Sequence, residues 1–224
     1  MSLLTDQEIR SPEKERQILD GAAAAFAQDG YEGASMSHIA AMAGVSKGTL
    51  YNYFAGKKEL FAAFVQRECT ERLLLFFDEV EPGLSLEATL LHLGRRMLAM
   101  LASESGLLIY RMVVAEARKF PELAEAFDEA GPKRGLARMA ALIDSHVESG
   151  ALVVADPGFA AEQLFSLLQT RLLMQRRLGL SAAPSEKDME HVVLEAVRLF
   201  LRGYGRAVAQ HVETSGSAAG NHAV

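Results

Sequence analysis

The sequence of 224 residues predicts an all-α protein, with a small three-helix unit at the N-terminus and a larger helical bundle after it. Apolar residues recur at intervals of three and four along almost every segment, which is the period of an amphipathic helix. No stretch of convincing length alternates apolar and polar residues, as a half-buried strand would. Proline, glycine and capping residues separate the periodic segments, so the helices can be placed in order.

The first three helices are defined by their start and stop signals. Ser11-Pro12-Glu13 begins the first, because serine caps free N–H groups and proline is favoured at the first helical position. Asp29-Gly30 ends it. Ser35 then caps a short helix to about Met42, and Ser46 caps a third to about residue 54.

Glycine and proline residues also divide the rest of the chain into helices. After Ala55-Gly56, a long amphipathic helix is expected to run as far as Pro82-Gly83. Its apolar side carries Leu60, Phe61, Phe64, Val65, Phe76 and Phe77. The later helices are predicted at about Leu86–Ala102, Leu107–Lys119, Pro121–Ser149, Pro157–Leu178 and Ser185–Gln210. Gly131-Pro132 is expected to kink the third of these.

Composition and charge restrict the class of protein. The net charge is −6, yet the window from Gly33 to Lys58 contains no Asp or Glu and holds three lysines, so it is locally cationic. The single cysteine, Cys69, excludes an internal disulfide framework. The N-terminus lacks the apolar core of a signal peptide, and the longest wholly aliphatic or aromatic run, Leu73 to Phe77, is too short to cross a membrane. We therefore expect a cytoplasmic protein.

The acid-free window has the layout of a helix-turn-helix. Gly44 occupies the turn, where glycine adopts a left-handed backbone most easily. Ser46 caps the next helix, whose exposed first turn would enter the major groove of DNA. A small core shared by the two helices is expected from Ile39, Ala43, Val45, Leu50 and Tyr53, with the small Ala40 allowing a close crossing.

The second helix of this motif is also chemically suited to DNA. Lys47 and Asn52 can donate to base edges, and Gly48 permits close approach to the backbone. Thr49 and Tyr51 each offer a hydroxyl and an apolar face for a thymine methyl. Two further side chains can reach phosphates, namely Tyr53 and Lys57, the second at the exposed start of the following helix.

The N-terminal segment strongly resembles the DNA-binding domain of TetR-family regulators. The residues that carry the resemblance are Ile18-Leu19, Ala23, Phe26, Gly30-Tyr31, Ser35-Met36, Ile39-Ala40, the run from Ala43 to Phe54, Lys57 and Leu60. The resemblance implies a homodimer with a helical ligand-binding domain, groove contacts from Lys47, Gly48, Thr49, Tyr51 and Asn52, and phosphate contacts from Ser35, Tyr53 and Lys57. Many family members have a serine where this chain has Gly56, which puts one capping contact in doubt.

The motif and the resemblance together divide the chain by role. Residues 1–10 are expected to be a flexible N-terminus, 11–56 the DNA-binding domain, 57–210 the ligand-binding and dimerisation domain, and 211–224 a disordered tail. The stretch Val113 to Leu123 is similar, more loosely, to a subgroup of TetR regulators linked to efflux or quorum-sensing control.

Two surfaces of the larger domain are candidates for function. A ligand pocket lined by adaptable methionines and one or two polar anchors is one, with Met97, Met100, Met112, Met139, Phe165, Gln169 and Arg171 as its candidates. Ordinary core filling by the methionines and a surface or dimer position for Arg171 are the alternatives. The other is a dimer surface on the last two helices, which can form a four-helix bundle with those of a partner. Its candidates form an apolar stripe, part of which must pack on the chain's own core: Val193, Ala196, Val197, Phe200 and Tyr204.

Other chemistries find less support in the residues. Gly44 to Gly48 matches the G-x-S-x-G string of a hydrolase, but a helix instead of a strand precedes Ser46. His191 and Glu195 lie one helical turn apart with no third metal ligand nearby, and Cys69 is expected to be packed and not a redox sensor. We expect that the protein binds no metal and no cofactor and is not an enzyme.

The sequence thus predicts a repressor that leaves a near-palindromic operator when an apolar or amphipathic molecule binds. The alternative is a DNA-binding dimer without an effector.

Overall fold

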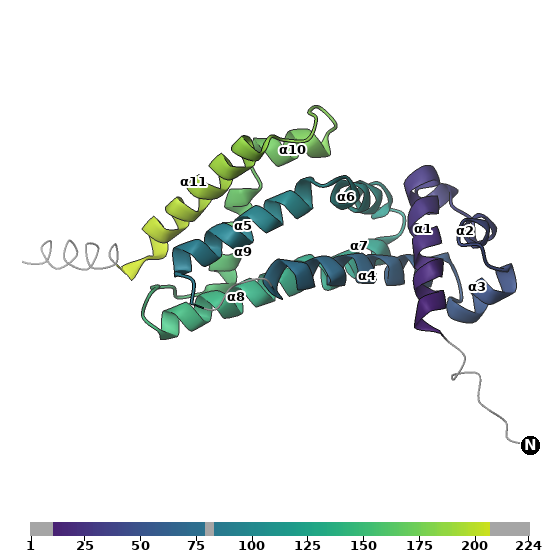
Figure 1. Cartoon of the computed structure of the whole chain (residues 1–224), viewed down its shortest axis with the longest axis horizontal. Coiled ribbons are helices and arrows are strands. Elements are labelled where there is room, and N and C mark those ends of the chain that lie inside the picture. Colours follow the sequence, from purple (N-terminus) through teal and green to yellow (C-terminus); the bar gives the residue numbers. More distant parts are fainter. Residues whose placement is uncertain (1–10, 79–82, 207–224) are drawn as a thin grey trace, which may run out of the picture. The chain divides into compact units, whose positions relative to one another are not determined.

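The structure is a computed structural model that describes residues 11–78 and 83–206, apart from the side chains of residues 72–78. This part of the chain forms eleven helices and no strand, which confirms the all-α prediction (Figure 1). An isolated antiparallel bridge joins Leu152 to Gly205. The helices are α1 Pro12–Gly33, α2 Met36–Met42, α3 Lys47–Tyr53, α4 Lys57–Asp78, α5 Leu86–Ala102, α6 Glu104–Glu116, α7 Pro121–Ala130, α8 Pro132–Glu148, α9 Pro157–Leu168, α10 Arg171–Arg177 and α11 Glu186–Tyr204.

Several predicted features lie outside the described residues. They are the flexible N-terminus at 1–10, the helix stop at Pro82, the helix end at Gln210, the tail at 211–224 and the side chains of Phe76 and Phe77.

The chain packs as two compact units. The N-terminal unit contains the residues up to Glu71 together with Leu108–Gly131, and the C-terminal unit contains Arg72–Leu107 and the residues from Pro132 onward. The segment 108–131 therefore packs with the N-terminal helices, although the residues on both sides of it belong to the C-terminal unit. The predicted boundary at residue 56 divides the chain by function, whereas these two units are defined by packing. The boundary therefore stays a prediction.

Aromatic packing holds the N-terminal unit together. The Phe26 ring of α1 is fully buried, with its centroid 5.3 Å from that of Phe61 and 5.7 Å from that of Phe64, both on α4. The same cluster includes Ile109 and Leu123 from α6 and α7. Such ring contacts add to the stabilisation from burial, so α4 and the segment 108–131 share one core with α1.

The end of α1 departs from regular helix, as the Asp29-Gly30 stop signal predicts. Gly30 has a φ of 69°, in the left-handed region where a side chain would be strained. The chain turns at this residue and continues to Gly33, and Ala34 donates its N–H to the Gly30 carbonyl. The kink places Tyr31 and Glu32 on a segment whose direction is set by its tertiary contacts.

The C-terminal unit buries apolar faces of α5, α8, α9 and α11. Its cluster includes Leu93 and Met97 of α5, Ile143 of α8, Leu164 of α9 and Val197 of α11. Helices α5 and α11 also share an ion pair, in which the Arg95 guanidinium donates to both Glu190 carboxylate oxygens at 2.6 and 2.7 Å. This pair raises the pKa of Arg95 and lowers that of Glu190, in each case mainly through the side-chain hydrogen bond.

Three predicted helix boundaries need correction. The single helix expected over Pro157–Leu178 is wrong, because the chain breaks at Gln169-Thr170 between α9 and α10. No glycine or proline marks this break; the new direction of α10 buries Leu173 and Arg176. The kink expected at Gly131-Pro132 is a complete break between α7 and α8. The helix expected from Leu107 begins earlier, at Glu104, because the Ser103 hydroxyl caps the Gly106 N–H at 3.1 Å.

Within the described residues no single helix has the length and apolar character needed to span a membrane; only the bent pair of α5 and α6 meets both criteria together.

Candidate nucleic-acid interface

The helix-turn-helix forms as its sequence predicts. Gly44 adopts a φ of 63° in the turn between α2 and α3. The Ser46 hydroxyl accepts a hydrogen bond from the Thr49 N–H at 2.9 Å, which satisfies one of the free donors at the start of α3. Of the predicted core residues, Ile39, Ala43, Leu50 and Tyr53 are buried and Val45 is half-buried. This core fixes α3 against α2 and leaves the opposite side of α3 in solvent.

The exposed side of α3 carries the residues predicted to enter the groove. Lys47, Gly48, Tyr51 and Asn52 are exposed, and Thr49 is half-buried with its hydroxyl 2.7 Å from that of Ser46. The Lys47 ammonium lies 5.9 Å from the centroid of the Tyr51 ring. The arrangement presents a cation, a phenol and an amide together on one short, capped helix.

The three predicted phosphate contacts already have partners within the chain. Ser35 caps α2 by accepting from the His38 N–H at 3.1 Å. The Tyr53 hydroxyl accepts from the Ser11 N–H at 2.9 Å. The Ser35 hydroxyl still carries a proton that it can donate to a phosphate oxygen. Both side chains therefore already serve the fold.

Lys57, the first residue of α4, is held from the side of α1. Its ammonium donates to the Glu32 carbonyl at 3.0 Å and lies 4.7 Å from the centroid of the Tyr31 ring. Partial burial lowers the pKa of Lys57, while the carboxylates of Glu116 and Glu32 act in the opposite direction. An ammonium has three donors, so two are left for other acceptors such as phosphate.

Two hydrogen bonds fix the start of α4, where Gly56 has no side chain to cap the helix. The Gly56 carbonyl accepts the first helical hydrogen bond, from the Leu60 N–H at 3.1 Å. The Glu59 carboxylate reaches back to the Ala55 N–H at 2.7 Å. This bond fixes the residue before α4, but it is not the bond to an N–H of the first turn that a serine at residue 56 would make.

Two residues of α1 that the sequence did not single out support the turn of the motif. The Gln17 amide donates to the Ala43 carbonyl at 2.7 Å. Gly21 faces the same residue so closely that a Cβ placed on it would lie 2.5 Å from the Ala43 Cα and N atoms. A glycine inside a helix was the only available signal for this close crossing, and sequence alone does not say which neighbour requires it.

Most of the predicted ligand-pocket residues lie in packed cores. Met97 and Met139 are buried in the cluster of the C-terminal unit, whereas Met112 is buried in that of the N-terminal unit. Met100 and Phe165 are half-buried. Gln169 is exposed and accepts a hydrogen bond from Arg177 at 3.0 Å. Met112 and the other two buried methionines thus belong to different packed clusters.

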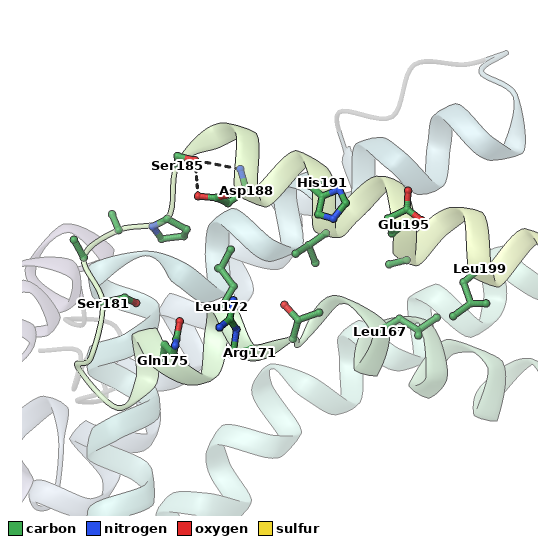
Figure 2. A pocket seen from close by; sticks show the side chains of 16 residues that line it. Leu167, Arg171, Leu172, Gln175, Ser181, Ser185, Asp188, His191, Glu195 and Leu199 are labelled. Atoms are coloured by element: carbon green, nitrogen blue, oxygen red, sulfur yellow. Dashed lines mark hydrogen bonds between the residues drawn. The ribbon is translucent and has the colours of Figure 1, made fainter.

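A hollow of about 840 Å³ instead lies along α10, α11 and the loop between them, and Arg171 is the one predicted pocket residue that lines it. Figure 2 shows Arg171, Leu172 and Gln175 of α10 on one side and Asp188, His191, Glu195 and Leu199 of α11 on the other. Leu167 of α9 also contributes. The hollow combines apolar walls with charges of both signs.

The predicted dimer stripe lies inside the protomer. Val193, Ala196, Val197 and Phe200 are buried in the chain's own cluster, and Tyr204 is half-buried with its hydroxyl donating to Gln163. Part of this stripe was expected to pack on the core of its own chain, and in the structure all four buried residues do so. The exposed stripe of α11 consists of His191, Glu195, Leu199 and Arg202. Glu195 and Leu199 each precede a buried residue by one position, which corresponds to about 100° around the helix.

The described residues give no structural support to the hydrolase motif or to a metal site. Ser46 caps α3 and follows a helix, so the hydrolase motif has no structural context. Across residues 11–78 and 83–206, no three potential ligands among His, Cys, Asp and Glu gather as a metal site would require. Cys69 is buried on α4.

Comparison with known proteins covers both parts of the chain. Residues 18–64 match the family described as bacterial regulatory proteins of the tetR family. Residues 88–206, more than half of the chain, match the C-terminal domain of AefR-like transcriptional repressors.

Solved structures match over nearly their whole length. A putative TetR-family regulator from Mesorhizobium loti is 32% identical with a TM-score of 0.80, and covers 88% of this chain and 98% of its own. The flavonoid-responsive regulator FrrA is 30% identical with a TM-score of 0.76, and the match covers 87% of this chain and 98% of that one.

Curated relatives match over a smaller part of the chain. The transcriptional repressor Rv1474c of Mycobacterium tuberculosis is 42% identical over 60 residues, which is 27% of this chain and 32% of the relative. The transcriptional activator FasR of Mycolicibacterium smegmatis is 47% identical over 60 residues, or 26% and 27%. The chain therefore matches between a quarter and a third of the length of these two relatives. Because its exposed α3 and its larger helical domain both match this family, the chain belongs to the TetR family of DNA-binding transcriptional regulators.

Proposed function

We propose that the protein is a homodimeric repressor that binds a near-palindromic operator and leaves it when a small apolar or amphipathic molecule binds. The observation that carries DNA recognition is the exposed side of α3, with Lys47, Tyr51 and Asn52 on one capped turn. Repression is favoured by the AefR-like repressor match of the larger domain. The curated relatives do not decide between repression and activation, since they include a repressor and an activator.

The dimer surface we propose is the exposed stripe of α11 with the neighbouring faces of α9 and α10. Leu199 is 57% exposed, a large fraction for a leucine, and lines the hollow with Leu167 (Figure 2). Arg171 and Glu195 line the same hollow, so a two-fold axis could bring each against the opposite charge of the partner. One recognition helix reads too few base pairs to be specific, and pairing two of them extends the site.

The contacts to DNA are expected to separate by type. Replacing Asn52 or Lys47 with alanine should relax the preference at particular base pairs, at a cost of roughly 1–3 kcal/mol for a direct contact. Lys57→Ala should weaken binding to all sequences and lower the salt slope by about one per half-site. Both are measured by titrating duplexes selected from a random pool by the wild-type protein, at several salt concentrations.

Lys187→Ala, on the exposed start of α11, provides the control for the loss of one positive charge. It should leave both specificity and salt slope unchanged. Equal losses on selected and random duplexes for Asn52→Ala or Lys47→Ala would contradict the assignment of base contacts.

The effector is proposed to bind among the helices of the C-terminal unit. Support comes from the size of this domain and from its similarity to FrrA, a flavonoid-responsive regulator. A polar anchor is available on α5, where the His92 Nε2 atom is buried without a hydrogen-bond partner in the described part of the chain. A buried polar group without a partner is costly, so a ligand that pairs with it gains affinity.

A thermal-shift screen that includes flavonoids and other amphipathic compounds should therefore yield stabilising ligands. Such a ligand is expected to weaken operator binding about 5- to 150-fold, corresponding to a coupling of about 1–3 kcal/mol. Operator DNA must weaken ligand binding by the same factor. His92→Phe should reduce ligand affinity, while His146→Phe should not, because its ring nitrogen already lies 2.9 Å from the Leu142 carbonyl.

One observation favours the alternative of a DNA-binding dimer without an effector. Met97 and Met139 fill the core of the C-terminal unit instead of lining a cavity. If no compound stabilises the protein and the operator affinity responds to none, this alternative replaces the ligand-responsive repressor.

A further inference from the structure

The connection between α6 and α7 contacts the kinked end of α1 through both charge and aromatic packing. The Lys119 ammonium forms an ion pair with the Glu32 carboxylate. One residue later, the Phe120 ring packs edge-on against Tyr31, with centroids 5.2 Å apart. Tyr31 is 3% exposed, so this aromatic contact belongs to the core and is not an incidental surface contact.

The same two residues of α1 hold the start of α4. Glu32 accepts from Lys57 through its carbonyl while its carboxylate binds Lys119. Tyr31 lies beneath the Lys57 ammonium and beside Phe120. Residues 31–32 thus link the first turn of α4 to the α6–α7 connection. A second contact, between Lys58 and Glu122 at 3.4 Å, joins α4 to α7 directly.

This position matters for DNA binding because α3 ends only three residues before α4 begins. Phe54 still donates its N–H to Leu50 of α3 at 3.0 Å, and Leu60 donates to Gly56 at 3.1 Å. A displacement of Lys57 therefore moves both its free donors and the end of α3. Because the helix is kinked at Gly30, tertiary contacts determine the direction of residues 31–32. The ion pair between Lys119 and Glu32 therefore also affects the position of Lys57 in the first turn of α4.

We propose that Lys119 and Glu32 are positioning residues for DNA binding: their ion pair sets the first turn of α4, and with it Lys57 and the end of α3. The segment 108–131 continues at both ends into the C-terminal unit. The proposal rests on the DNA-binding role of α3 and needs no particular effector.

The test is a charge swap, read out in two independent ways. Lys119→Glu places two carboxylates together, and Glu32→Lys with Lys119→Glu restores an opposite pair. Amide hydrogen exchange over residues 54–60 should be several-fold faster in Lys119→Glu and return to the wild-type rate in the double variant. Affinity for a duplex selected by the wild-type protein should fall about three- to tenfold and recover, while the melting temperature changes by less than about 3 °C because both side chains are exposed.

Arg118→Glu is the matched control, since it makes the same change of charge at the neighbouring exposed residue. It should leave the exchange rates over residues 54–60 unchanged. The proposal is overturned if Arg118→Glu and Lys119→Glu weaken DNA binding equally, or if the double variant does not recover. Unchanged exchange in Lys119→Glu would also overturn it, and this readout holds even if DNA selection fails.

Discussion

Leu199→Arg is expected to convert the dimer to a monomer and to weaken operator affinity about 10²- to 10⁴-fold, the gain that linking two binding modules normally provides. The leucine is 57% exposed on α11 and does not belong to the buried cluster of its own chain. Its replacement should therefore leave the protomer folded while placing a charge in the proposed interface. Sedimentation velocity measures the mass, and titration of full-site and half-site duplexes measures the affinity.

Val114→Arg is the control for adding a charge at an exposed apolar position, because Val114 is 59% exposed on α6 and belongs to the other packing unit. It should remain dimeric. If Leu199→Arg also remains dimeric with full operator affinity, the exposed stripe of α11 is not the interface. A folded monomer that binds a half-site as tightly as the wild-type protein binds the full site would contradict the need for a dimer.

The features that sequence predicted well are those set by local chemistry. The caps at Ser11, Ser35 and Ser46 and the turn at Gly44 each depend on a few adjacent residues, and all appear in the structure. The exposed face of α3 follows from the same logic, because a short capped helix has only one side to bury. The DNA-binding residues could thus be placed from the sequence, although their contacts remain proposals.

The features that sequence missed depend on how distant helices pack. An apolar stripe shows that a helix buries one face, but not whether its own chain or a partner covers that face, so Val193 to Phe200 were assigned to the dimer. Methionine is equally compatible with a core and a pocket wall, so Met97 and Met139 could not be placed. The break at Gln169-Thr170 carries no local signal, because burial of Leu173 and Arg176 determines it.

Gly21 is the position where distant packing is expected to matter most for the DNA-binding unit. In an open helix, glycine to alanine is stabilising by roughly 0.5–1 kcal/mol, because alanine loses less conformational freedom on folding. Here the new Cβ would lie 2.5 Å from the Cα, Cβ and N atoms of Ala43, the cap of α2. The crossing of α1 over α2 must therefore open.

Gly21→Ala should consequently lower the free energy of unfolding by about 1–3 kcal/mol, the usual range for overpacking, and shift the melting temperature by roughly 2–4 °C per kcal/mol. Because Ala43 leads directly into Gly44 and the turn before α3, operator affinity should fall as well. Thermal melting and DNA titration measure the two effects.

Gly203→Ala is the matched control, since no atom lies within 4 Å of a Cβ added to that residue of α11, and it should be neutral or stabilising. Adding Ala43→Gly to Gly21→Ala removes only the Cβ contact and leaves the Cα and N contacts, so it should restore little; full recovery, or a stable Gly21→Ala, would show that the close approach does not constrain the motif.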